Sequence, residues 1–120
     1  MEKLIFIVDD SDANLTLAAS ILENEYRILS MPSAERMFVL LGKKIPDLIL
    51  LDIEMPEMSG IEAAAKLKET PQWKEIPIIF ITGWIDEKVE ADAAMSGAQG
   101  IIKKPINETV LKNGVKKVLG

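Results

Sequence analysis

The chain has 120 residues and contains no cysteine and no histidine. The absence of cysteine excludes disulfide bonds, thiolate metal sites and cysteine nucleophiles, and it is consistent with a reducing compartment. The absence of histidine excludes triads built on histidine, histidine-ligated zinc sites and a phosphohistidine within this chain. These residues therefore cannot supply a thiol or an imidazole as a nucleophile.

Long hydrophobic runs are also lacking, because no stretch approaches the roughly 20 apolar residues that a membrane helix needs. The first three residues precede an apolar run that Asp9 ends after five residues, so no export signal is predicted. The net charge of −5 disfavours contact with the phosphate backbone of nucleic acids. We expect a soluble, cytoplasmic protein with no membrane insertion and no direct binding of nucleic acid.

The composition and the order of apolar patterns predict one α/β domain over residues 1–120. Apolar residues make up 48% of the chain, enough for one core. Apolar runs predict strands over residues 4–8, 26–30, 48–51, 78–81 and 101–102, and helical spacing predicts helices over 12–23, 33–43, 60–69, 86–96 and 107–119. The mixed polarity of 26–30 places that strand at the sheet edge. Strict alternation of strand and helix is typical of a doubly wound parallel sheet with helices on both faces.

Polar side chains follow four of the predicted strands. They are Asp9 and Asp10 after the first run, Asp52 after the third, Thr82 after the fourth and Lys104 after the fifth. In such sheets the binding crevice lies at the carboxyl ends of the strands. We therefore expect these side chains to share one site.

The three acids predict a bound cation, since two carboxylates about 4 Å apart repel by about 4 kcal/mol at an effective dielectric of about 20. Oxygen ligands at a wet site favour Mg²⁺, and Mg²⁺ favours a phosphoryl group, whose charge it neutralises. Lys104 adds positive charge, and the Thr82 hydroxyl can donate a hydrogen bond to a phosphoryl oxygen. Asp52 remains as the nucleophile that would form an aspartyl phosphate.

Taken together, these residues resemble the receiver domain of bacterial two-component response regulators, a CheY-like superfamily. The resemblance spans nearly the whole chain, in order, through the segments Asp9-Asp10, Asp52 with Met55-Pro56 and Gly60, Thr82-Gly83, and Lys104-Pro105. It implies a flavodoxin-like fold of five parallel strands in the order 2-1-3-4-5. It also implies that the Lys104–Pro105 peptide bond is cis.

The resemblance further implies a role for each site residue. Asp52 would accept a phosphoryl group from a histidine kinase or a histidine phosphotransfer protein. Mg²⁺ would be held by Asp9, Asp10, Asp52 and the backbone carbonyl of Glu54, while Thr82 and Lys104 bind the phosphoryl oxygens. The domain would change conformation in the region 86–107 and regulate a downstream protein, with self-phosphorylation and slow dephosphorylation as its only chemistry. Homodimerisation is left open.

Two positions stand out against this pattern. Receivers usually carry Tyr or Phe three residues before the site lysine, but this chain has Ile101, which cannot swing a flat ring. Trp84, two residues after Thr82, is a candidate for bulk at the rim of the pocket. Glu54 lies two residues after Asp52, and we expect its side chain to lean over the acyl phosphate and alter its lifetime.

Other interpretations compete with this one. Asp9 and Asp10 could simply cap the first helix, and either Lys103 or Lys104 could be an ordinary surface lysine. A Mg²⁺-dependent phosphatase with an aspartate nucleophile would suit Asp52, but it usually has a second Asp where this chain has Glu54. A flavin-binding module needs a phosphate-cradling loop where this chain has two acids. A pseudo-receiver that acts only as a docking surface is the last alternative.

Overall fold

The computed structural model describes residues 2–120, and within them strands and helices alternate along the chain. The strands are β1 (Leu4–Val8), β2 (Arg27–Met31), β3 (Leu48–Asp52), β4 (Ile78–Thr82) and β5 (Gly100–Lys103). The helices are α1 (Asp12–Leu22), α2 (Ala34–Leu41), α3 (Gly60–Glu69), α4 (Glu87–Met95) and α5 (Glu108–Leu119). Each bound lies within two residues of the prediction, and β3 and β4 each run one residue further, so that Asp52 and Thr82 end strands.

The strands form one parallel sheet in the order β2-β1-β3-β4-β5, as predicted. β1, β3 and β4 are buried along their whole length, which is why they read as unbroken apolar runs. β2 mixes exposed, partly buried and buried residues and lies at the edge, as its mixed polarity predicted. The doubly wound α/β fold is therefore confirmed.

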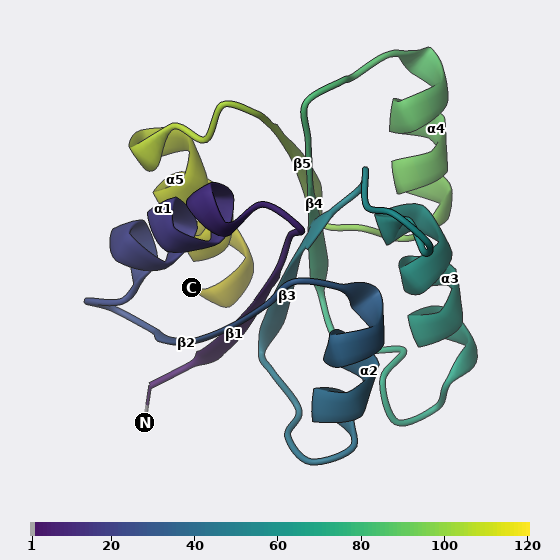
Figure 1. Ribbon diagram of the computed structural model, residues 1–120, viewed down its shortest axis with the longest axis horizontal. Coiled ribbons are helices and arrows are strands. Elements are labelled where there is room, and N and C mark those ends of the chain that lie inside the picture. The colour runs from purple at the N-terminus through teal and green to yellow at the C-terminus, as the bar shows by residue number, and fades with distance from the viewer. Residues whose placement is uncertain (1) are drawn as a thin grey trace.

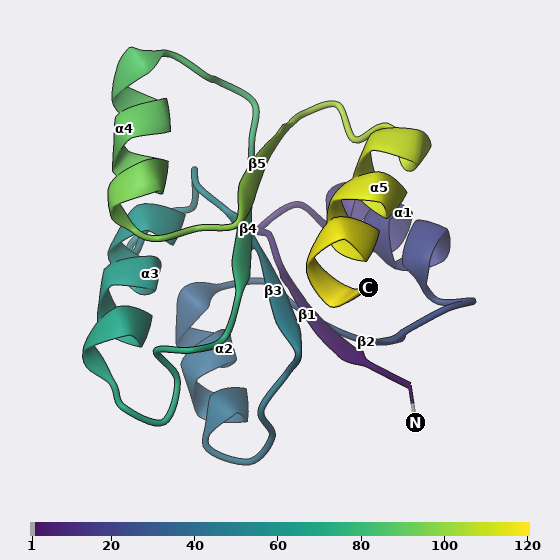
Figure 2. The same cartoon turned by 180° about the vertical axis from the view of Figure 1, so that it is seen from behind.

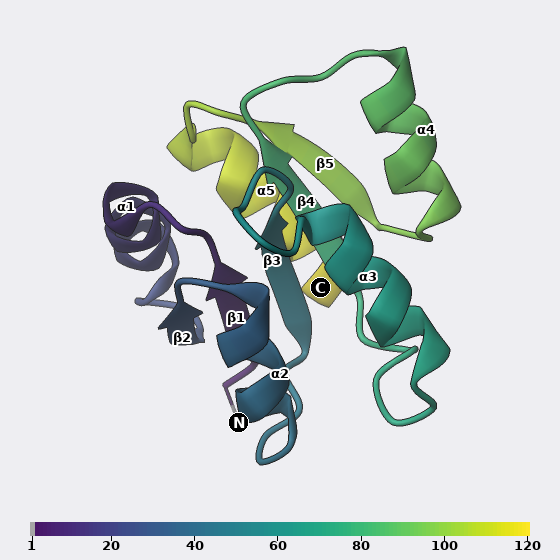
Figure 3. The same cartoon turned by 45° about the vertical axis from the view of Figure 1, so that its right-hand side comes forward.

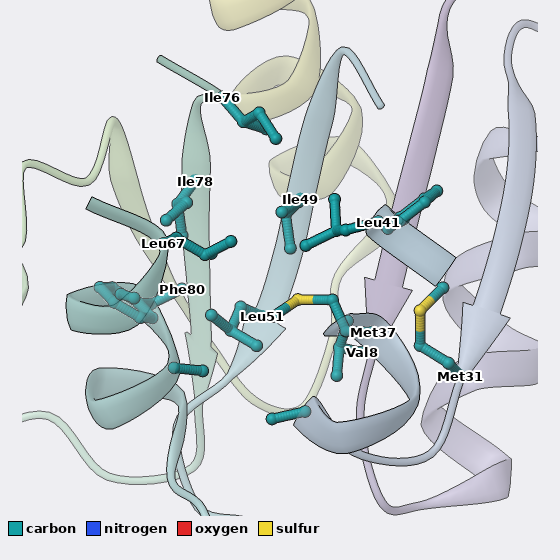
Figure 4. Close-up of a cluster of buried hydrophobic side chains, with 14 of the residues drawn as sticks. Val8, Met31, Met37, Leu41, Ile49, Leu51, Leu67, Ile76, Ile78 and Phe80 are labelled. Carbon is teal, nitrogen blue, oxygen red and sulfur yellow. The ribbon is translucent and has the colours of Figure 1, made fainter. Parts of the chain in front are cut away.

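Helices cover both faces of the sheet, with α1 and α5 on one side and α2, α3 and α4 on the other (Figures 1 and 2). Successive strand residues point to opposite faces, so Ile5 and Ile7 pack with α1 and α5, whereas Phe6 and Val8 face α2 and α3. Figure 4 shows the second of these clusters, in which Met37 and Leu67 reach the sheet from α2 and α3. The two clusters pack the sheet between the helical layers.

Every helix begins at a residue whose side chain accepts a hydrogen bond from a backbone N–H three residues later. The N-caps are Ser11, Ser33, Ser59, Asp86 and Asn107. Ser11 is therefore the cap of α1, which leaves Asp9 and Asp10 free for another role.

Gly60 is required where α3 begins, because the helix approaches the end of β3 very closely. Its N–H donates to the carbonyl of Ile53 at 2.9 Å, and a Cβ at this position would overlap the carbonyl oxygen of Asp52. The glycine thus lets α3 pack against the backbone of the strand that carries Asp52.

None of the helices in residues 2–120 combines the length and apolar character needed to span a membrane.

Replacing Gly60→Ala should lower the free energy of unfolding by about 2 kcal/mol or more, because two backbone segments must separate. Gly114→Ala in α5 is the matched control. Its Cβ would meet only side chains, the nearer being Ile102 Cδ1 at 3.4 Å, and alanine suits a helix interior better by about 0.5–1 kcal/mol. Urea titration of both variants checks this, and equal effects would contradict it.

Candidate functional site

The carboxyl ends of four adjacent strands bring the predicted site residues together. Asp9 follows β1, Asp52 ends β3, Thr82 ends β4 and Lys104 follows β5. Asp52 is paired in register with Ile81, and Thr82 with Lys103, so these ends lie level with one another. In Figure 3 the loops that leave β3, β4 and β5 emerge at the same end of the sheet.

The acidic residues form one cluster. One carboxylate oxygen each from Asp9, Asp10 and Asp52 lies within 4.8 Å of the others. Asp9 and Asp52 are buried, with exposed fractions of 2% and 0%, whereas Asp10 is exposed. Asp9 Oδ1 also accepts a hydrogen bond of 2.9 Å from the N–H of Ser11, which fixes its orientation.

Lys104 is the cation of this cluster. Its Nζ donates a hydrogen bond to Asp52 Oδ1 at 3.0 Å and lies 3.1 Å from Asp9 Oδ2. Its own N–H donates to the carbonyl of Thr82 at 2.7 Å, and its peptide bond with Pro105 is cis. Lys103, by contrast, is exposed, so of the two lysines it is Lys104 that lies in the site.

The burial of these charges shifts their protonation. Desolvation raises the pKa of the Asp52 carboxyl most strongly, repulsion from Asp9 and Glu54 adds to it, and Lys104 opposes it; the result is a pKa of about 7 instead of 3.8. Burial lowers the pKa of Lys104, but its contacts with Asp52 and Asp9 outweigh burial and raise that pKa. The lysine therefore stays charged while Asp52 holds its proton unusually well.

Two buried carboxylate oxygens lack a hydrogen-bond donor, Asp9 Oδ2 and Asp52 Oδ2. The first has Lys104 nearby at 3.1 Å, as an ion pair without hydrogen-bond geometry, but Asp52 Oδ2 has no hydrogen-bond partner anywhere in residues 2–120. A buried, unpaired carboxylate oxygen is costly. This orphaned atom and the all-oxygen donor set fit a hard divalent cation such as Mg²⁺.

Glu54 makes contacts that the sequence did not predict. Its carboxylate accepts a short hydrogen bond from the Thr82 hydroxyl through Oε2, and one of 3.1 Å from the N–H of Gly83 through Oε1. The side chain thus spans from the loop after β3 to the loop after β4. The only signal in the sequence was the position of Glu54, two residues after Asp52 in the loop that follows β3.

Ile101 stands where receivers usually carry an aromatic residue, and Trp84 was the candidate to supply bulk at the pocket rim. Ile101 is half-buried and packs against the core beneath α4. Trp84 is 66% exposed, and its indole N–H donates to Asp86 Oδ2 at 2.9 Å. Trp84 is therefore a surface residue tied to the cap of α4, and it does not replace a buried aromatic at position 101.

Comparison with known proteins agrees with this geometry. The profile of the response regulator receiver domain matches residues 5–116. The chain belongs to this family. It is 31% identical to the polar-differentiation response regulator DivK of Brucella ovis, over 100% of this chain and 98% of that protein. Receiver domains are the signalling switches of two-component systems, and phosphorylation on an aspartate is general among them.

Two further similarities have a narrower meaning. A probable cyclic di-GMP phosphodiesterase of Vibrio cholerae is 38% identical over 92% of this chain, but the chain spans only 25% of that protein's length. The crystal structure of chemotaxis protein CheY4 from Vibrio cholerae superposes with a TM-score of 0.93, covering 98% of this chain and 99% of that one, at 24% identity. The CheY4 structure supports the fold alone. The family assignment favours a signalling domain over the phosphatase and the flavin-binding alternatives.

The raised pKa of Asp52 predicts a pH-dependent stability in the absence of divalent metal. Its folded-state pKa lies above the unfolded value, so the native chain should lose stability as pH rises from about 4 to about 7. The Asp52→Asn variant carries no charge at this position, so its stability should not fall in this way. At pH 8 its free energy of unfolding should exceed that of the native chain by about 2 kcal/mol, because loss of the hydrogen bond to Lys104 offsets part of the gain.

Thermal unfolding in chelator at several pH values checks this, with the exposed Glu57→Gln as control. Parallel pH profiles for the native chain and Asp52→Asn would contradict the assignment of a strained, buried charge to Asp52.

Proposed function

We propose that this receiver domain accepts a phosphoryl group on Asp52 from a phosphohistidine partner and passes the signal on by changing conformation. The observation that carries the proposal is the placement of Asp52. One oxygen of its carboxylate accepts a hydrogen bond from Lys104, and the other is buried with no hydrogen-bond partner among the described residues, inside a cluster of acids at the carboxyl edge of the sheet. An acid in that position is poised for a cation and an electrophile.

The transfer itself is a displacement at phosphorus. A carboxylate oxygen of Asp52 attacks, the bond from phosphorus to the donor's imidazole nitrogen breaks, and the electron pair leaves with that nitrogen, which takes up a proton. Lys104 carries the positive charge that balances the incoming phosphoryl oxygens, and the Thr82 hydroxyl is their hydrogen-bond donor. Water later attacks phosphorus and releases phosphate, which regenerates Asp52.

Asp9, Asp10 and Asp52, with the backbone carbonyl of Glu54, are the proposed ligands of Mg²⁺. When bound, the ion would neutralise charge on the phosphoryl oxygens. Asp9 is held for this role by the N–H of Ser11, whereas exposed Asp10 can adjust.

The partners follow from the chemistry of the chain. Because these 120 residues contain no histidine, the phosphohistidine lies outside them, in a histidine kinase or a histidine phosphotransfer protein. The output is regulation of a further protein through the region 86–107, which adjoins both the Thr82 and the Lys104 loops. The chain needs no metabolic substrate for this function.

Incubation with acetyl phosphate and Mg²⁺ should add one phosphoryl unit to the native chain and none to Asp52→Asn. Intact-mass spectrometry measures it, with Asp12→Asn, an exposed acid on α1, as the control that should gain the unit. A gain by Asp52→Asn would show that another residue is the acceptor.

Asp10→Asn should weaken Mg²⁺ binding about 30-fold, since one negative charge about 4 Å from a divalent ion contributes about 2 kcal/mol even at the dielectric of water. Calorimetric titration measures the affinity, and Asp12→Asn again serves as the control for lost charge. Equal affinities for the native chain and Asp10→Asn would remove Asp10 from the ligand set.

A further inference from the structure

The carboxylate of Glu54 already occupies the Thr82 hydroxyl, the donor proposed above for the phosphoryl oxygens, together with the N–H of the next residue, Gly83. Each of its oxygens takes one donor, the Thr82 hydroxyl and the Gly83 N–H. The Thr82 hydroxyl has a single proton and a second acceptor, the carbonyl of Trp84, at 3.0 Å. The shorter contact and the formal charge of Glu54 assign that proton to the carboxylate.

We propose that Glu54 is a built-in competitor of the phosphoryl group, holding the Thr82–Gly83 donors in the unphosphorylated state and giving them up on phosphorylation. This inference rests on the proposed function, because it takes Asp52 as the acceptor. A carboxylate and a phosphoryl group are both anions with oxygens spaced to fit two donors. Only one of them can use the Thr82 proton at a time.

The surroundings of Glu54 suit a side chain that leaves. It is exposed, and within residues 2–120 it forms no ion pair with a lysine or arginine. Asp52 beside it is fully buried, so a phosphodonor reaches its carboxylate only after a neighbouring side chain moves. Repulsion between Glu54 and the added phosphoryl charge drives the displacement in the same direction.

A purely structural role for Glu54, as an anchor for the Thr82–Gly83 loop, makes the opposite prediction. Loss of an anchor would loosen the loop and weaken the binding of an anion at Asp52, whereas loss of a competitor strengthens it. The loop also has a hydrogen bond that does not involve Glu54, because the N–H of Trp84 donates to the hydroxyl oxygen of Thr82 at 3.2 Å. The direction of the change in affinity therefore separates the two roles.

The experiment titrates the full chain with beryllofluoride in the presence of Mg²⁺, an anion that mimics a phosphoryl group on a carboxylate. Glu54→Ala should bind beryllofluoride at least roughly fivefold more tightly than the native chain, because two charge-assisted hydrogen bonds no longer compete with the anion. The affinity of Glu54→Gln should lie between those of the native chain and Glu54→Ala. The exposed Glu57, three residues on, supplies the matched controls Glu57→Ala and Glu57→Gln, which should bind as the native chain does. Unchanged or weaker binding by Glu54→Ala overturns the inference.

A double-mutant cycle tests the shared donor directly. In the native background, Thr82→Ala removes the hydroxyl that donates to Glu54 in the free state and to the anion in the bound state. The two losses partly cancel in the measured affinity. In the Glu54→Ala background the same change removes a donor from the bound state alone, and binding should weaken by a larger factor. Equal factors in both backgrounds would show that Glu54 acts only through its charge and would overturn the shared-donor inference.

Asp52→Asn distinguishes failure of this inference from failure of the proposed function. If Asp52→Asn binds beryllofluoride as the native chain does, the acceptor is not Asp52 and both proposals fall. If binding requires Asp52 but is indifferent to Glu54, the competitor alone is disproved. In the expected result, binding requires Asp52 and removal of Glu54 strengthens it.

Discussion

This site depends on one ammonium group, Lys104 Nζ, which lies between two buried carboxylates. It is 3.0 Å from Asp52 and 3.1 Å from Asp9. Without it, two acids about 4 Å apart would repel by about 4 kcal/mol at an effective dielectric of about 20. The lysine offsets part of that repulsion, but burial still raises the pKa of Asp52 to about 7, and within residues 2–120 one of its oxygens has no hydrogen-bond partner. The sheet and its two helical layers hold this unfavourable arrangement in place, which leaves the site ready to accept positive charge or a phosphoryl group.

Throughout the site, carboxylates of the chain itself bind the positive charge and the hydrogen-bond donors that would also suit an anion from outside. Lys104 is engaged by Asp9 and Asp52, and the donors of Thr82 and Gly83 are engaged by Glu54. On the proposed function, phosphorylation of Asp52 exchanges these internal partners for phosphoryl oxygens. Such an exchange alters the β4–α4 and β5–α5 loops together, which is how a change at one carboxylate could reach a protein-binding surface.

Much of this arrangement could be predicted from the sequence because it depends on local patterns. Unbroken apolar runs mark β1, β3 and β4, and the mixed polarity of residues 26–30 marks the edge strand observed as β2. A parallel sheet then brings Asp9, Asp52, Thr82 and Lys104 to one edge. The side chain of Glu54 was harder to place, because its partners belong to a loop 28 residues further along the chain. Likewise, no local pattern reveals that Asp52 retains an unpaired oxygen, since that depends on how far Lys104 reaches. The position of Trp84 at the surface follows from its bond to Asp86, again a contact between side chains.

The most direct test of the central claim is a crystal structure of the chain with Mg²⁺ and beryllofluoride. The account predicts an adduct on a carboxylate oxygen of Asp52, with Lys104 Nζ and the Thr82 hydroxyl turned to its fluorines and Glu54 withdrawn from Thr82 and Gly83. An adduct on any other residue, or an Asp52 adduct that leaves both Lys104 and Glu54 with their present partners, would contradict it.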